Sequence, residues 1–237
     1  MNKQLLSILG IAVILSSCQK NDINSDNLPS TEAKVTIGYP TSLISTPIIT
    51  SSFPQEIIDG QTPIDIIPNI TQKIRTATPT IHYGTINLSS VINNAGENLK
   101  IALDATDRAN NYIVIEGKQY NLAQFHYHYS SEHTFKGRHS AMEVHFVNIA
   151  ADNSYAVMGT MIELGDENDA MGTLIDNSPT TAGATNSPNI PFDVTSLLPE
   201  NTGRYYTYIG SLTTPNYGAN SALTNGGPVT WILFKNK

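Results

Sequence analysis

Apolar and polar residues alternate with a period of two over much of the chain after Gly60, and turn residues separate the alternating runs. Because successive side chains of a strand point to opposite faces, this pattern predicts strands rather than helices. Continuous apolar runs indicate strands buried on both faces. Strands are expected at 91–94, 98–103, 112–116, 121–129, 141–149, 155–164 and 229–234, and short helices at 166–174 and 194–198.

The composition agrees with a mainly β fold and narrows the possible partners. The 237 residues include 16 Gly and 13 Pro, which suit frequent turns between strands. The net charge of -7 argues against nucleic acid as a partner, because phosphate binding needs a basic face. Cys18 is the only cysteine, so the domain contains no internal disulfide.

The N-terminal residues predict export and membrane anchoring. Lys3 precedes an apolar stretch at 5–15 that is too short to span a bilayer. The stretch ends in Leu-Ser-Ser-Cys, which resembles the bacterial lipobox and implies a signal peptide over 1–17 and lipidation of Cys18. Residues 18–59 are expected as a tether and lead-in to the domain. The predicted location is the cell envelope, in the periplasm or at the outer-membrane surface; the alternative is an ordinary signal peptide with an incidental cysteine.

His126, His128 and His145 lie in strand phase within a stretch of twenty residues. Gln124, His126 and His128 occupy positions i, i+2 and i+4, so on a strand their side chains share one face. Glu143 and His145 share a face of the next expected strand. The polar segment 130–140 between them can return the chain antiparallel, which brings the three imidazoles together.

Three imidazole nitrogens are a common zinc ligand set, and three protein ligands leave a fourth position open for water, as in catalytic sites. Gln124 and Glu143 can bond the second ring nitrogens of these histidines, which orients the rings. A His-x-His pair alone is weak evidence for a metal. His133 is expected to pack and hydrogen-bond, His139 to be a solvated loop residue, and His82 is assigned no role.

These residues and several other segments resemble the α-class carbonic anhydrases. The resemblance covers roughly 60–237, and the matching segments keep the order they have in that family. They are 61–66, 124–128, 131–134, 142–147, 210–215 and 229–232.

The resemblance implies one domain over 60–237, with a large twisted, mostly antiparallel central sheet and a few short helices. It implies Zn²⁺ at the bottom of a conical cleft, held by His126, His128 and His145. Thr213 matches the residue that accepts a hydrogen bond from zinc-bound hydroxide, and Glu132 matches the carboxylate that orients it. The residues that match the substrate-binding wall are Thr214, Val147, Val157, Leu212 and Trp231.

The implied reaction is the reversible hydration of carbon dioxide to bicarbonate. The chain departs from the family pattern in three places. It has no histidine near 93–99, where the family often carries a proton shuttle. Its segment 216–228 is longer and richer in Gly and Asn than the family pattern. The family usually continues for several tens of residues beyond the strand that contains Trp231, so this chain resembles a shortened form.

Three functions are therefore open. The first is a carbonic anhydrase, and the second is a zinc-binding module of the same fold that acts as a surface binding protein with little or no catalysis. The third is a cupin, because His126, His128 and Glu132 fit a cupin metal motif. The glycine expected ahead of that motif is replaced by Tyr120, and the expected Pro-x-Gly turn is absent, which disfavours the cupin. The oligomeric state is not indicated.

Overall fold

The computed structural model describes residues 36–39, 62–76, 78–95, 98–214, 216–217, 223–224 and 228–234. The chain divides into two units, Met1–Thr31 and Glu32–Lys237, and all described residues belong to the second. The predicted leader, Cys18 and positions 96–97 therefore lie outside the described residues. Within these ranges, none of the helices is both long and apolar enough to cross a bilayer.

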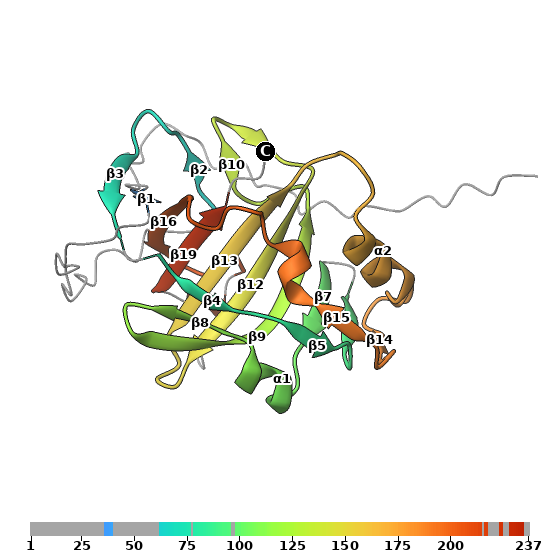
Figure 1. Ribbon diagram of the computed structural model, residues 1–237. Coiled ribbons are helices and arrows are strands. Elements are labelled where there is room, and N and C mark those ends of the chain that lie inside the picture. The colour runs from blue at the N-terminus through green and yellow to red at the C-terminus, as the bar shows by residue number, and fades with distance from the viewer. Residues whose placement is uncertain are drawn as a thin grey trace, which may run out of the picture. The chain divides into compact units, whose positions relative to one another are not determined.

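A large sheet organises the described part of the chain (Figure 1). Its path runs β14-β6-β7-β9-β12-β13-β19-β16-β1-β3, with β8 and β4 attached beside β9. Neighbours pair antiparallel except β13 with β19 and β1 with β3. The strands are β1 Thr36–Tyr39, β3 Gln72–Arg75, β4 Thr80–His82, β6 Val91–Asn94, β7 Asn98–Ala102, β8 Tyr112–Ile115, β9 Lys118–Tyr129, β12 Met142–Ala150, β13 Tyr155–Ile162, β14 Thr185–Asn186, β16 Tyr205–Gly210 and β19 Val229–Phe234.

Smaller elements surround this sheet. Asp104 begins α1 by accepting hydrogen bonds from the amides of Thr106 and Asp107, and Asn168 begins α2 by accepting from Met171. The remaining elements are β2 Asp65–Ile66, β5 Thr85–Asn87, α1 Ala105–Asn110, β10 Thr134–Phe135, β11 Arg138–His139, α2 Asp169–Asp176, β15 Pro191–Asp193, the 3₁₀ helix η2 Val194–Leu197, β17 Asn216–Tyr217 and β18 Leu223–Thr224.

The predicted mainly β fold with a large, mostly antiparallel sheet is confirmed. All seven expected strands form, within a few residues of their expected ends. The two expected helices correspond to α2 and η2, whereas α1 was not predicted. β1 lies inside the segment expected as tether and pairs with β16 and β3.

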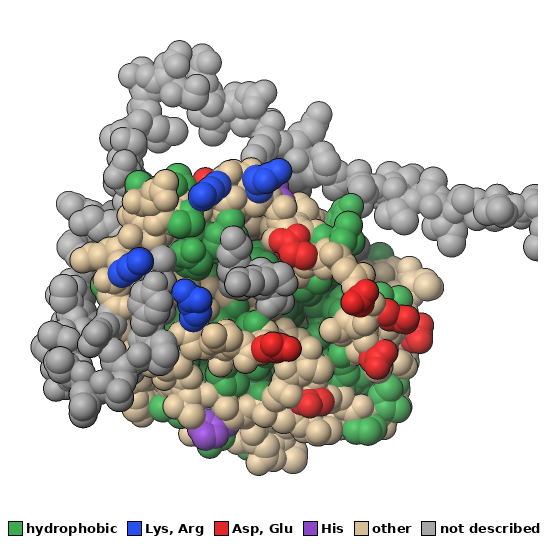
Figure 2. All heavy atoms as spheres, turned by 45° about the horizontal axis from the view of Figure 1, so that its top comes forward, with side chains coloured by type: hydrophobic (Ala, Val, Ile, Leu, Met, Phe, Trp, Pro, Cys, Tyr) green, Lys and Arg blue, Asp and Glu red, His purple; other side chains and the backbone are tan. Residues whose placement is uncertain are grey.

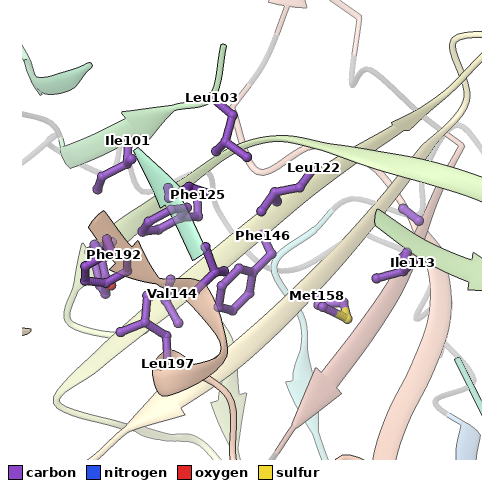
Figure 3. Packing of buried hydrophobic residues seen from close by; sticks show 14 of the residues in the cluster. Ile101, Leu103, Ile113, Leu122, Phe125, Val144, Phe146, Met158, Phe192 and Leu197 are labelled. Carbon is purple, nitrogen blue, oxygen red and sulfur yellow. The ribbon is translucent and has the colours of Figure 1, made fainter. Parts of the chain in front are cut away.

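One face of the sheet packs into the main hydrophobic core (Figure 3). Phe125 of β9 and Val144 and Phe146 of β12 lie there, fully buried. Short segments cover them, including Phe192 of β15 and Leu197 of η2. Burying large side chains such as Phe contributes roughly 1.5–3 kcal/mol each, so this layer fixes which face of β9 and β12 points inward.

The opposite face of the same strands carries a second, smaller apolar cluster and the polar residues of interest. Val157 of β13 and Trp231 of β19 are fully buried in this cluster. The odd-numbered positions of β12 therefore point away from the main core, and His145 is one of them.

A β-bulge interrupts the alternation in β9. Val147 pairs with Gln124, but the next residue of β12, Asn148, pairs with Leu122, so Ala123 is the extra residue. Leu122 and Phe125 are three positions apart, yet both contribute to the main core. The extra residue lets both side chains lie on the same face of the sheet, although an odd spacing would normally place them on opposite faces.

Charged side chains are unevenly distributed on the face shown in Figure 2. Asp and Glu side chains gather toward the side of α2, while Lys and Arg lie on the other side and near the top. The segment that leads into α2 contains Glu163, Asp166 and Glu167, and α2 begins with Asp169; all four are exposed. Part of the net charge of -7 is therefore concentrated in one segment.

Candidate metal centre

Two neighbouring strands bring the three predicted histidines together. In the β9–β12 register, His126 lies opposite His145 and His128 lies opposite Glu143. The ring centroids of the three histidines lie 4.8 to 5.2 Å apart. One ring nitrogen of each lies within 4.8 Å of the others. The strand phase of the sequence thus correctly predicted the convergence of these residues.

The other ring nitrogens of His126 and His145 contact Gln124 and Glu143. His126 Nδ1 lies 2.8 Å from Gln124 Oε1, and His145 Nε2 lies 2.8 Å from Glu143 Oε1. The His145 N–H is not aligned with that oxygen, so the two groups make a close contact rather than a linear hydrogen bond. Oxygen acceptors at these atoms place hydrogens on His126 Nδ1 and His145 Nε2, which leaves lone pairs on His126 Nε2 and His145 Nδ1.

His126 and His128 are held in the neutral form. Burial, then the rings of His145 and His128, then the ammonium group of Lys100 lower the pKa of His126 to about 2. Burial and then the ring of His145 lower the pKa of His128 to about 4. Metal ligation requires deprotonated imidazoles, so both side chains are ready to bind an ion at neutral pH.

The nitrogen donors fit a zinc ion. His128 Nε2 is buried and has no hydrogen-bond partner. A buried nitrogen left without a partner costs free energy unless something else occupies its lone pair. A cation at the convergence of the three rings satisfies it, and nitrogen donors are characteristic of zinc sites. The donor set therefore fits zinc.

Glu143 is the centre of a buried hydrogen-bond network. Its Oε2 accepts from the amides of Glu132 and His133, each at 2.9 Å. Its Oε1 lies 2.7 Å from His133 Nδ1 and 2.8 Å from His145 Nε2. Burial alone would raise the pKa of Glu143, but its interactions with the His145 and His133 side chains outweigh burial and hold the pKa well below its usual range.

His133, Glu143 and His145 form a second group whose donor atoms lie close together. We do not assign a metal to it, because its atoms already have partners. The second ring nitrogen of His133, Nε2, lies 2.7 Å from the Tyr208 hydroxyl. This confirms the prediction that His133 packs and hydrogen-bonds.

The network extends to the loop that contains Thr213. Tyr208 donates to Thr62 Oγ1 at 3.1 Å, and the Ser211 amide donates to the same atom at 3.0 Å. Trp231 Nε1 donates to the Ser211 carbonyl at 2.8 Å. A continuous set of buried polar contacts thus links Glu143 with the residues that precede Thr213.

Glu132 and Thr213 form the predicted pair. Burial raises the pKa of the Glu132 carboxyl, while the electrostatic interaction with His145 and a hydrogen bond from Thr213 partly offset this effect. Glu132 Oε2 lies 3.3 Å from His128 Nε2 and 3.8 Å from His145 Nδ1. The carboxylate therefore borders the convergence point of the histidines.

The predicted apolar wall lies in the second cluster. Val147, Val157 and Trp231 are buried there, and Leu212 packs against it. The indole of Trp231 lies 5.0 Å from the ring of His145, centroid to centroid. Thr214 is exposed, so its predicted role in the site stays a prediction.

Other histidines lie apart from the centre. His82 is exposed and stacks on Tyr112, with ring centroids 4.5 Å apart. His139 is exposed, as expected, but it lies in the short strand β11 rather than in a loop, and its Nδ1 lies 2.6 Å from the Ser131 carbonyl.

Three residues near the centre were missed as site residues. Tyr208 and Thr62 extend the Glu143 network, and Lys100 lies across from His126 in the sheet. Lys100 falls in an expected strand, but nothing in the sequence indicates that this strand pairs with the one carrying His126. The resemblance included Thr62 only as part of a matching segment.

Residues 51–237 match the family described as eukaryotic-type carbonic anhydrase. The chain belongs to the carbonic anhydrase family. This match includes every histidine, carboxylate and threonine of the centre described above. The predicted family membership is therefore confirmed.

Bacterial relatives and solved structures agree with this membership. The chain is 32% identical over 167 residues to a carbonic anhydrase of Neisseria gonorrhoeae, covering 70% of this chain and 61% of that protein. It is 38% identical over 158 residues to a carbonic anhydrase of Klebsiella pneumoniae, covering 66% and 61%. The α-carbonic anhydrase of Thermovibrio ammonificans, solved with the inhibitor sulfanilamide, matches with a TM-score of 0.64 and 33% identity, covering 75% and 72%. The chain thus spans about three fifths of the length of the Neisseria and Klebsiella proteins.

Proposed function

We propose that this protein binds Zn²⁺ through His126, His128 and His145 and catalyses the reversible hydration of carbon dioxide to bicarbonate. The convergence of these three imidazoles, one with a buried nitrogen that lacks a partner, carries the proposal. Family membership supports it, because the bacterial relatives are named carbonic anhydrases.

Zinc, when bound, supplies a Lewis acid that lowers the pKa of a coordinated water to about 7, a value established for carbonic anhydrase itself. Thr213 donates its only hydroxyl hydrogen to Glu132. Its oxygen can then only accept a hydrogen bond from a second hydroxyl in the site. Thr213 and Glu132 would thereby orient the hydroxide that attacks carbon dioxide.

The apolar cluster suits carbon dioxide, which has no net charge or dipole. Val147, Val157 and Trp231 offer no hydrogen bond toward the centre, because the indole N–H of Trp231 is already donated to Ser211. A small apolar molecule can lie against this wall without leaving a buried polar group unpaired. This wall lies next to His145, and so next to the proposed site of the reaction.

Zinc content and carbon dioxide hydration of the purified domain test the proposal together. We expect about one zinc per chain and hydration that a sulfonamide abolishes. His145→Ala removes one of three ligands, and we expect it to weaken zinc binding by more than roughly 100-fold, beyond the loss typical of an outer-shell change. The matched control is His82→Ala, which removes an exposed histidine away from the centre.

Stoichiometric zinc without hydration above background would contradict the enzyme and favour the zinc-binding module. Full zinc occupancy in His145→Ala would contradict the ligand assignment. The two readouts are independent, so the metal site and the catalysis can fail separately.

We propose in addition that lipidation of Cys18 anchors the protein in the bacterial cell envelope. The lipobox-like segment before Cys18 motivates this proposal. Cys18→Ser removes the thiol that the lipid would occupy, so we expect the protein to leave the membrane fraction and its labelling by radioactive palmitate to disappear. Unchanged fractionation and labelling would contradict the anchor.

A further inference from the structure

A lysine side chain shares the sheet face of the zinc ligands. In the antiparallel pair of β7 and β9, Lys100 lies directly opposite His126. Residues directly opposite each other in such a pair have side chains on the same face, with Cβ atoms about 4.5–5.5 Å apart. The flanking residues Leu99 and Ile101 pack on the main core of the other face. Lys100 is therefore directed to the side of the metal centre.

The charge of Lys100 has no counter-ion in the described part of the chain. No ion pair or hydrogen bond of its ammonium group occurs there, whereas Lys118 pairs with Asp152 at 2.6 Å. The positive charge of Lys100 also contributes to the low pKa of His126, after burial and the neighbouring histidines. The two groups thus interact electrostatically.

A second polar group without a partner lies beside it. Asn98 precedes Lys100 by two positions in β7, so both side chains point to the same face. The Asn98 Oδ1 atom is buried and has no hydrogen-bond partner. A 180° rotation of this amide presents its NH₂ group instead. Lys100 and Asn98 together offer donors for a small ligand next to His126.

We propose that Lys100 is the cationic half of a small-anion site beside the metal centre, and that it favours monovalent anions such as bicarbonate there. The inference rests on the proposed function for the identity of the anion, because bicarbonate is the product of that reaction. Carbon dioxide carries no charge, so the charge of Lys100 does not affect its binding. The same positive charge opposes the binding of Zn²⁺ to the three histidines.

Lys100→Met tests the inference through two effects of opposite sign. Titration calorimetry of the zinc-loaded protein with thiocyanate measures anion affinity, and competition with a chromophoric chelator measures zinc affinity. We expect thiocyanate to bind about fivefold more weakly, because one favourable charge interaction is lost. Zinc is expected to bind about threefold more tightly, because a repulsive one is removed. Both changes should shrink at high ionic strength.

Two further variants make the test specific. Lys100→Arg keeps the charge and should retain wild-type affinities within twofold. Lys118→Met removes a lysine eight positions from His126 along β9, roughly 26 Å away and well beyond the Debye length of about 8 Å. It should change neither affinity.

The outcomes separate the inference from the proposed function. Weaker binding of both zinc and thiocyanate in Lys100→Met would point to a structural role and overturn the inference. Unchanged affinities would overturn it as well. Failure of the wild-type protein to bind zinc would instead contradict the proposed function.

Discussion

Replacement of Glu143 by glutamine is expected to weaken zinc binding by roughly 10–100-fold and to lower the free energy of unfolding by about 3 kcal/mol. The carboxylate meets two donors at each of its oxygens. A glutamine keeps one acceptor but places an NH₂ group at the other position. Whichever way the amide lies, two N–H groups then face its hydrogens, so buried donors lose their acceptor. His145 also loses the anionic partner that fixes the orientation of its ring.

Zinc affinity is measured by competition with a chelator, and stability by urea unfolding of the zinc-free protein. Glu167→Gln is the matched control, because Glu167 is exposed in the segment before α2. Zinc affinity within twofold of the wild type in Glu143→Gln would show that His145 does not depend on this carboxylate.

The zinc-free protein is expected to lose about 4 kcal/mol of stability between pH 7 and pH 5. The pKa of His126 is lowered to about 2 and that of His128 to about 4 in the folded state, against an unfolded value of about 6.5. Between these values the unfolded chain binds more protons, so acid favours unfolding. The contribution of His126 and His128 to the stability is fully present above about pH 6.5. It is lost as the pH falls toward their folded pKa values.

Glu143 acts in the same direction but in a lower range. Its folded pKa is depressed, so its contribution is present above the unfolded value of about 4.3 and is lost below it. Urea unfolding at pH 7, 6 and 5 measures the contribution of the histidines to the stability, because that of Glu143 changes only at lower pH. In the double variant His126→Gln/His128→Gln, most of the loss should disappear. Equal wild-type stability at pH 7 and pH 5 would contradict the buried, neutral state of these two rings.

The convergence of the three histidines was predictable because side chains two positions apart on a strand point to the same face. Gln124, His126 and His128 alternate within five residues, and a polar connection leads to Glu143 and His145. Two adjacent antiparallel strands are a local structure, so their pairing follows from short-range sequence. Side-chain direction then brings the histidines together without further information about the fold.

Contacts between distant segments were not predictable in this way. Tyr208 reaches His133 across 75 positions, and Thr62 meets Ser211 across 149. The pairing of β7 with β9, which places Lys100 beside His126, also depends on the order of strands in the sheet. Hydrophobic periodicity shows which face of a strand is buried, but not which strand lies next to it. The bulge at Ala123 was missed because apolar residues occur both before and after it, so the sequence is read as one uninterrupted strand.

The bulge at Ala123 affects where a change in chain length would disturb the site. It absorbs one extra residue just before the run that carries Gln124, His126 and His128, so the ligand register with β12 stays regular. A single insertion or deletion within 124–128 would turn some of these side chains into the main core, because a shift of one residue reverses every side chain beyond it. The connection between β9 and β12 is constrained as well, because the amides of Glu132 and His133 bind Glu143. A change of length is therefore expected to disturb the site least on the N-terminal side of Ala123.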